Sequence, residues 1–302
     1  MAISPPFTAV PIHWRAPRAG WRDYLDLTRP RVTLVVTLTG GPALVLGGGG
    51  LSAPASLGVL AALTLLGAGC SALNAWIERD RDALTARTRS RPLPERRIAP
   101  SAALAFGGAT SAAGIGLLGL LGNGTAATLG FITLALYLGP YTVWAKPRTA
   151  WSAVVGAAPG AAAPLIADAA AHGHVGSWGW VLFAIVFLWQ PPHVWSIELF
   201  RSQEKAEAGL PAMPALIGQD MTRRLILIWI AVLLPVTALP LLADGPGFPY
   251  AAAVLGAGLY FARAAVVALR TPSPRADRDT FLASLVHMTL LFGVLLVSLA
   301  LR

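Results

Sequence analysis

Long apolar runs, separated by short clusters of charge, divide this chain from end to end. Each run has about 18 to 23 residues, the length needed to cross a ~30 Å hydrocarbon core. Only 12% of the residues are charged, about half of the roughly 25% found in soluble domains. We therefore predict an all-α integral membrane protein, a single bundle of nine transmembrane helices. The expected spans are 33–50, 55–77, 101–121, 124–144, 151–171, 178–200, 222–243, 249–269 and 281–300.

Positive charge falls almost entirely on one side of these predicted spans. If the first span runs from inside to outside, 22 of the 23 Lys and Arg residues lie in the N-terminal tail or in the 2–3, 4–5, 6–7 and 8–9 connections and at the span ends that border them. Only Arg302 falls on the other side. This is the distribution of the positive-inside rule, so we predict a cytoplasmic N-terminus. The same distribution assigns the net charge of +9 to membrane topology and argues against a nucleic-acid partner.

The chain has room for one membrane domain and for no independent soluble domain. Residues 1–24 are expected to form a disordered cytoplasmic tail, and residues 25–302 the membrane domain. Cys70 is the only cysteine, which excludes a disulfide within the chain and a Cys-based metal site.

Acidic side chains gather at the cytoplasmic end of the second predicted span. Asn74, Glu78 and Asp82 recur every four residues, so a helix places them on one face, and Asp80 lies between the two acids. Like charges so close together repel one another, and a cation offsets that cost. Oxygen ligands without His or Cys suit a hard ion such as Mg²⁺. The spacing therefore predicts a Mg²⁺ site.

Arginines follow this acidic segment, at Arg87, Arg89 and Arg91. Guanidinium groups bind phosphate oxygens in pairs, and Mg²⁺ commonly bridges carboxylates to phosphates. Together the two segments indicate a diphosphate site at the membrane mouth. The alternative is a solvated loop in which Arg and Asp side chains pair with one another.

Polar groups also lie inside the sixth predicted span. Gln190, His193 and Glu198 are costly there and are treated as functional candidates. Pro191 and Pro192 are expected to break the backbone hydrogen-bond ladder. His193 lies about 10 Å from the inner end of its helix, at 1.5 Å per residue. The alternative role for His193 is a packing hydrogen bond between helices. Beyond this span, Glu204 and Glu207 resemble a second acidic pair facing the first.

These motifs, taken in order, resemble the UbiA superfamily of intramembrane prenyltransferases, and within it the branch that farnesylates heme. The resemblance covers about residues 25–225. It rests on Leu27-Thr28-Arg29-Pro30-Arg31-Val32, on Asn74-x-x-x-Glu78-x-Asp80-x-Asp82 with Arg87-Thr88-x-x-Arg91-Pro92-Leu93-Pro94, on Tyr141-Thr142-x-Trp144-x-Lys146-x-Arg148-Thr149, and on Trp189-Gln190-Pro191-Pro192-His193.

The resemblance implies a Mg²⁺-dependent prenyltransferase domain over residues 25–302, with farnesyl diphosphate and heme B as substrates. The diphosphate would leave, the heme vinyl group would attack the allylic cation in an apolar cavity, and one water would add to the product as the hydroxyl of a hydroxyethylfarnesyl group. The implied metal ligands are Asn74, Glu78, Asp82 and Glu204. The implied diphosphate ligands are Asn74, Arg87, Arg91, Lys146, Arg148 and Lys205. The implied catalytic groups are Asp80, Lys146, Arg148 and His193, and the candidate heme contacts are Gln190, His193 and Trp195.

The resemblance also implies a bacterial inner-membrane enzyme with its active site on the cytoplasmic side, working with a heme A synthase or an oxidase assembly partner. The sequence departs from the family pattern at Glu204-Lys205, where Asp-Tyr is usual, at Pro211-Ala212-Met213-Pro214, where Pro-Met-Leu-Pro is usual, and at His287, where Tyr is expected. These departures bear on substrate choice more than on reaction class.

Three other functions fit parts of the pattern. A prenyltransferase acting on a quinone precursor or another ring would share the acidic face. A transporter would need an acidic or polar stripe across the whole membrane, whereas the acids here crowd at the inner face and the outer half contributes only two of them, Asp168 and Asp244, near helix ends. A non-catalytic heme-handling factor would not need the oxygen ligands of Asn74, Glu78 and Asp82.

Overall fold

The computed structural model describes residues 19–46, 50–202, 209–242 and 247–301, and in these ranges the chain forms helices and connecting turns without strands. Eight helical segments are long and apolar enough to cross a membrane. They are α3 (Ala53–Asp82), α4 (Pro100–Leu121), α5 with η2 (Gly124–Leu136 and Tyr137–Ala145), α6 with α7 (Ser152–Gly160 and Ala163–His172), α8 (Ser177–Phe200), α11 with η3 (Gln219–Ala238 and Leu239–Leu242), α12 (Gly247–Arg270) and α13 (Pro274–Ala300).

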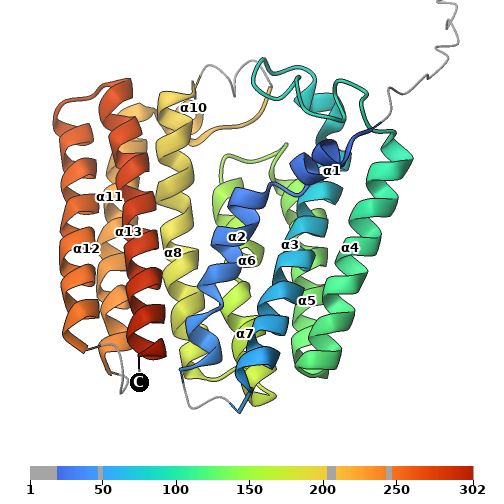
Figure 1. Cartoon of the computed structure of the whole chain (residues 1–302). Coiled ribbons are helices and arrows are strands. Elements are labelled where there is room, and N and C mark those ends of the chain that lie inside the picture. Colours follow the sequence, from blue (N-terminus) through green and yellow to red (C-terminus); the bar gives the residue numbers. More distant parts are fainter. Residues whose placement is uncertain (1–18, 47–49, 203–208, 243–246, 302) are drawn as a thin grey trace, which may run out of the picture.

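The predicted first span at 33–50 differs from the other eight. It forms α2 (Pro30–Thr39), which ends at Gly40 and is followed by the single turn η1 (Pro42–Leu44). Ten helical residues rise only about 15 Å, half of a hydrocarbon core. The segment still packs against the bundle, with α2 against α3 and η1 against α7 (Figure 1). Eight of the nine expected spans are therefore confirmed as long helices, and the count of nine stays a prediction.

Two of the eight segments, α5 with η2 and α6 with α7, depart from regular α-helix geometry within the bundle. A third segment, α8, stays α-helical although it contains two prolines. The end of α5 widens into the π-helix η2, which contains Pro140, and α6 is separated from α7 by a turn after Gly160. By contrast, α8 continues as an α-helix through Pro191 and Pro192. The ladder lacks the two hydrogen bonds that Pro191 and Pro192 cannot donate, as expected, but the helix itself is not interrupted. The missing N–H groups cost only local hydrogen bonds, and the fixed φ of proline remains compatible with a helix.

The bundle is packed through small residues, as is usual for helices in lipid. The α3–α4 contact is the most extensive, and α8 packs against both α11 and α13. A Cβ on Gly69 of α3 would overlap Ser111 Oγ, and one on Gly114 of α4 would lie 2.6 Å from the Leu66 backbone nitrogen. Only glycine allows the two backbones to approach this closely. The opposite, outer surfaces are apolar and exposed, as at Leu120 and Ile228, which suits a multi-pass membrane protein.

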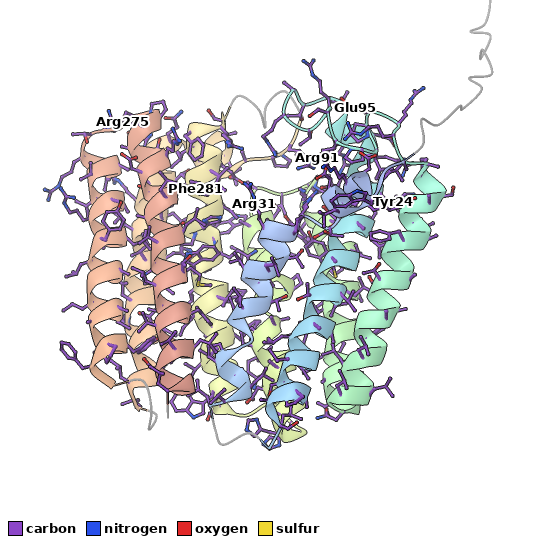
Figure 2. All side chains as sticks on the ribbon, viewed as in Figure 1. Tyr24, Arg31, Arg91, Glu95, Arg275 and Phe281 are labelled. Carbon is purple, nitrogen blue, oxygen red and sulfur yellow. The ribbon has the colours of Figure 1, made fainter. Side chains whose placement is uncertain are left out.

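The C-terminal ends of α3, η2, α8 and α12 lie at one end of the bundle, drawn at the top of Figure 1, while the C-terminus of the chain lies at the other end. Arg31, Arg91 and Arg275 lie at this upper end (Figure 2). The short helix α1 (Trp21–Leu27) lies there too and crosses the expected boundary between tail and membrane domain at residue 24. Arg97 holds α1 through an ion pair of 2.8 Å with Asp23. The segregation of basic residues therefore appears in the fold, and its assignment to the cytoplasm stays a prediction.

Candidate active site

The acidic face of α3 points into the bundle near its upper end. The 30-residue helix runs without interruption through Asn74, Glu78 and Asp82, so their spacing places them on one side, as expected. Asn74 is fully buried, Glu78 is 5% exposed, and the Asp82 side chain is 13% exposed. Three polar groups are thus withdrawn from solvent and need partners.

Two of these groups find partners on η2. Asn74 donates a hydrogen bond from Nδ2 to Thr142 Oγ1 at 3.0 Å. The Lys146 ammonium lies 2.5 Å from Glu78 Oε1 and 2.7 Å from Glu78 Oε2. The Asn74 oxygen Oδ1 is buried and has no hydrogen-bond partner among the described residues. The face therefore combines a neutralised carboxylate with an amide oxygen that is available to a ligand.

The π-helix explains how η2 presents these partners. Its backbone bonds span five residues, as in Lys146 N to Tyr141 O at 2.9 Å, and the Thr142 hydroxyl donates to Tyr137 O at 2.7 Å. Pro140 has no N–H, which removes a bond that a regular α-helix would use. Single π-turns within α-helices occur frequently at functional sites. Here the wide turn directs Thr142 and Lys146 toward α3.

Asp82 belongs to a second polar group beneath the loop of residues 83–99. Arg91 Nη1 lies 2.6 Å from Asp82 Oδ2, so part of the alternative of Arg–Asp self-pairing is realised here. Asp26, Arg29, Asp82 and Arg91 line a cavity of about 300 Å³. Burial, and next the charge of Arg29, lower the pKa of the Arg91 guanidinium, while Asp82 opposes that change. Two guanidinium groups close enough to repel each other form a natural anion site.

Sequence reasoning did not assign a role to Arg29 or Thr142. Arg29 has a left-handed backbone, with φ of 48°, and directly precedes Pro30, the first residue of α2. A residue before proline is disfavoured in the right-handed α region, so α1 and α2 do not continue as one helix through this point. The available signal was the position of an arginine at the start of the first apolar run. For Thr142, the signal was its place four residues before Lys146.

A mainly apolar chamber of about 200 Å³ lies below this polar end. Its walls come from α2, α3, α5, η2, α6, α7 and α8. They comprise Val32, Thr33, Val36, Thr37, Leu63, Leu66, Gly67, Cys70, Ser71, Thr133, Tyr137, Tyr141, Gly156, Pro159, Gly160, Ala163, Ile166 and Gln190. Tyr141 connects the chamber to the polar end, because Lys146 Nζ lies 5.8 Å from the centre of its ring.

Several predicted residues lie away from the buried face. The Asp80 side chain is 84% exposed and pairs with Arg79 at 3.5 Å. Arg148 is exposed and donates from Nη1 to the Val143 carbonyl at 2.7 Å, so it closes the end of η2. Arg87 is exposed and lies close enough for its charge to act on Arg91. The structure therefore brings Asn74, Glu78, Asp82, Arg91 and Lys146 to one end and leaves Asp80 and Arg148 on its surface.

Three predicted residues cannot be placed. Glu204, Lys205 and Glu207 lie outside the described residues. Glu198, in contrast, is buried at the end of α8, where its Oε2 accepts a hydrogen bond of 2.9 Å from the Met213 N–H. This bond ties the first residue of α10 (Met213–Ile217) to α8.

His193 faces α13 rather than the Lys146 end of the site. Its Nδ1 lies 2.8 Å from Ser284 Oγ, and its ring stacks on Trp189 at 4.4 Å. Trp189 in turn donates from Nε1 to the Ser284 carbonyl at 2.8 Å. His193 thus has a hydrogen-bond partner on a neighbouring helix, Ser284 of α13, as the packing alternative requires. Any further role of the ring would fall to Nε2.

The other two candidate heme contacts have different surroundings. Trp195 is fully buried and meets Trp151 and Trp229 edge to face, at 6.0 and 5.6 Å. Gln190 lines the apolar chamber and is the member of this group that a chamber ligand could touch.

The face can supply oxygen ligands to a metal ion from Asn74 Oδ1 and the carboxylates of Glu78 and Asp82. Within the described ranges, no three His, Cys, Asp or Glu residues form a complete metal cage. An orphaned amide oxygen beside a carboxylate fits Mg²⁺, which keeps several waters and bridges few protein ligands. The chemistry of the donor set therefore suits a hard, hydrated cation.

Comparisons with known proteins place this geometry in context. A model of the UbiA prenyltransferase family matches residues 33–297. A protein of Methylorubrum extorquens named protoheme IX farnesyltransferase is 39% identical over 292 residues, covering 93% of this chain and 90% of the relative. A Brucella anthropi protein of the same name is 41% identical over 285 residues, covering 91% and 90%.

Solved structures share the fold at low sequence identity. A structure of digeranylgeranylglyceryl phosphate synthase matches with a TM-score of 0.75 at 16% identity, over 93% of this chain and 99% of that one. A UbiA homologue from Archaeoglobus fulgidus, bound to DMAPP and Mg²⁺, matches with a TM-score of 0.61 at 15% identity, over 90% and 99%.

Proposed function

This chain belongs to the UbiA prenyltransferase family, and we propose that it transfers the farnesyl group of farnesyl diphosphate to a vinyl group of heme B, producing heme O. The observation that carries the proposal is the buried Glu78–Lys146 pair beside Asn74, directly above an apolar chamber. The names of the relatives supply the substrates, because this geometry would serve any prenyl diphosphate.

Mg²⁺ would be held by Asn74 Oδ1, Glu78 and Asp82, with Glu204 as a further proposed ligand. When bound, the metal supplies positive charge that stabilises the diphosphate as it leaves. An archaeal homologue of the same fold was solved with DMAPP and Mg²⁺ bound, which supports a metal-dependent reaction but no particular ligand.

The basic side chains of this end would hold the diphosphate. Lys146 is neutralised by Glu78 in the free protein, and a bound cation at Glu78 would release the ammonium toward the leaving group. Arg29 and Arg91 line the adjoining cavity and would bind further phosphate oxygens as paired donors. Arg87 and Lys205 remain proposed contacts from the surrounding loops. We assign Asp80 and Arg148 supporting roles at the surface of the site.

The apolar chamber would take the farnesyl chain and keep water from the allylic cation. Tyr141 lies at its polar end, so the bond that breaks would lie between this ring and the ammonium of Lys146. Low polarity strengthens the attraction between the leaving group and its cations, and it prevents hydrolysis of the cation.

Heme B would enter beside α8, with Gln190 and His193 as the proposed contacts. Trp195 would act indirectly, by fixing α8 against Trp151 and Trp229. We further propose a bacterial inner-membrane location with the site facing the cytoplasm, and a heme A synthase or oxidase assembly factor as the next partner. A ring acceptor from quinone synthesis is the competing proposal.

Expression in cells that lack heme O synthase tests the function in its natural setting. Extracted hemes should include heme O, identified by mass, when this chain is expressed, and should not when Glu78→Gln is expressed. Restoration of quinone synthesis without heme O, in cells lacking the corresponding quinone prenyltransferase, would favour the competing acceptor.

A further inference from the structure

Gln190 lines the apolar chamber and carries a side-chain oxygen that pairs with no other group of the described chain. Gln190 Oε1 is buried and has no hydrogen-bond partner among the described residues. Three hydroxyls of the same chamber are engaged: Thr33 donates to Thr28 O, Thr133 donates to Leu129 O, and Thr37 accepts from Thr64. An unpaired amide oxygen buried in apolar surroundings is costly, and its natural partner is a small hydrogen-bond donor.

Gly160 fixes the position of this amide. A Cβ at residue 160 would lie 2.5 Å from Gln190 Oε1, 2.6 Å from Nε2 and 2.9 Å from Cδ. The backbone at the end of α6 thus lies flat against the whole carboxamide, and every residue other than glycine would displace it. Close packing on one side leaves the amide little rotational freedom.

Helix α6 also shows how far the Gln190 amide lies from Tyr141 and the polar end of the chamber. Gly156 packs on Tyr141, with 2.6 Å from a Cβ at this position to Cε2 of the ring, and Gly160 follows one turn later. Four residues of an α-helix rise about 6 Å. The amide therefore lies about one helical turn deeper than the tyrosine that borders Lys146, at the depth that the proposed function assigns to the first carbons of the prenyl chain.

The proposed reaction requires water at one place and excludes it at another. The C1–O bond of farnesyl diphosphate breaks with its electron pair leaving on the diphosphate. The π electrons of the heme vinyl group form the new C–C bond, and the positive charge passes to the vinyl carbon next to the porphyrin. A water oxygen then bonds to that carbon, and the proton of the water passes to the released diphosphate. A free supply of water would instead hydrolyse the farnesyl cation.

We propose that Gln190 Oε1 binds the single water that becomes the hydroxyl group of the product, an inference that rests on the proposed function. The amide oxygen accepts a hydrogen bond from this water and leaves an oxygen lone pair directed at the acceptor carbon. A carboxamide suits this task because it stays neutral and does not compete with the vinyl group for the cation. Without this water, the same cation loses a proton and yields a product lighter by one water.

The test is the mass of the farnesylated heme formed by the full-length protein in membranes. Gln190→Met keeps the length of the side chain and removes the amide. We expect farnesyl transfer to continue, with the ratio of dehydrated to hydroxylated product rising about tenfold, as for the loss of one hydrogen bond. Gly160→Ala displaces the amide without removing it and should raise the same ratio to a smaller extent. Thr110→Val, which alters a hydroxyl bonded within α4 and away from the chamber, is the matched control and should leave the ratio unchanged.

The outcomes separate this proposal from the proposed function. Failure of the wild-type protein to farnesylate heme overturns the function itself. If the wild type is active and both Gln190→Met and Gly160→Ala yield only hydroxylated product, Gln190 does not bind the water. If Gln190→Met abolishes all transfer, Gly160→Ala decides: an unchanged product ratio in that variant overturns the assignment, and an increased ratio supports it.

Discussion

Lys146 and Glu78, 68 residues apart in the sequence, form an ion pair in which the ammonium lies within 2.7 Å of both carboxylate oxygens. The pair joins α3 to η2 at the polar end of the chamber. It also means that, before any metal binds, a lysine already neutralises a carboxylate of the predicted metal face. We expect the same two groups to separate when Mg²⁺ and a diphosphate bind.

This pair gives a prediction for stability. Lys146→Met leaves Glu78 buried without a cation, so the variant should lose about 2 kcal/mol of stability, less than the ~3–5 kcal/mol of a fully buried pair because Lys146 is 24% exposed. Adding Glu78→Gln should restore most of this loss without restoring turnover. Thermal unfolding in detergent measures the first effect, and product formation the second. Equal stability of the single and double variants would mean that the pair is screened by solvent.

Two acids of the same helix should differ in their contribution to turnover. Glu78→Gln removes a buried carboxylate of the predicted metal face and should reduce turnover at least about a hundredfold, since charge stabilisation by a metal is worth several kcal/mol. Asp80→Asn changes an exposed side chain two residues away and should retain most turnover. The comparison uses Mg²⁺-dependent heme O formation at equal protein levels. A comparable loss in Asp80→Asn would return Asp80 to the catalytic role that the motif implied.

The acidic face of α3 could be predicted from the sequence. The basic side chains that lie against it could be predicted only in part. The period of Asn74, Glu78 and Asp82 depends on local helix geometry alone, which is why it was confirmed in the structure. The partner of each group depends on which helix packs opposite, so neither the Asn74–Thr142 bond nor the position of Arg29 could be read from spacing. The spans were predictable from apolar length. The short α2 was not, because its end at Gly40 lies within a continuous apolar run.

The two prolines of α8 show what sequence leaves open. The loss of ladder hydrogen bonds at Pro191 and Pro192 follows from the residues alone, whereas the continuity of the helix depends on its tertiary packing against α11 and α13. The exposed positions of Asp80 and Arg148 have a local explanation. The motif lists residues in order, whereas the helix rotates successive side chains to different faces.

Glycine substitutions should test the chamber. Gly156→Ala places a methyl group 2.6 Å from the Tyr141 ring, so it should displace the ring and raise the KM for farnesyl diphosphate about tenfold. Gly116→Ala adds the same methyl group at a helix position with no neighbouring atom within 4 Å. That control should leave KM and expression unchanged. If Gly156→Ala also leaves KM unchanged, Tyr141 does not border the prenyl site.

Comparing variants of His193 and Ser284 tests whether His193 has a structural or a functional role. If the histidine only packs helices, His193→Ala and Ser284→Ala should have similar, small effects, because each removes the same bond, worth about 0.6 kcal/mol in a membrane. Our account predicts instead that His193→Ala reduces heme O formation about a hundredfold while farnesyl diphosphate binding survives. Ser284→Ala should remain within a few-fold of wild type. Matching kinetics in the two variants would assign His193 to packing.

The most direct test of the account combines purified protein, farnesyl diphosphate, Mg²⁺ and heme B, with the extracted heme analysed by mass. The account predicts a heme heavier by one farnesyl group and one water, formed only when all three additions are present and absent with Glu78→Gln. Unchanged heme, together with prenylation of an aromatic acid supplied in the same mixture, would contradict it.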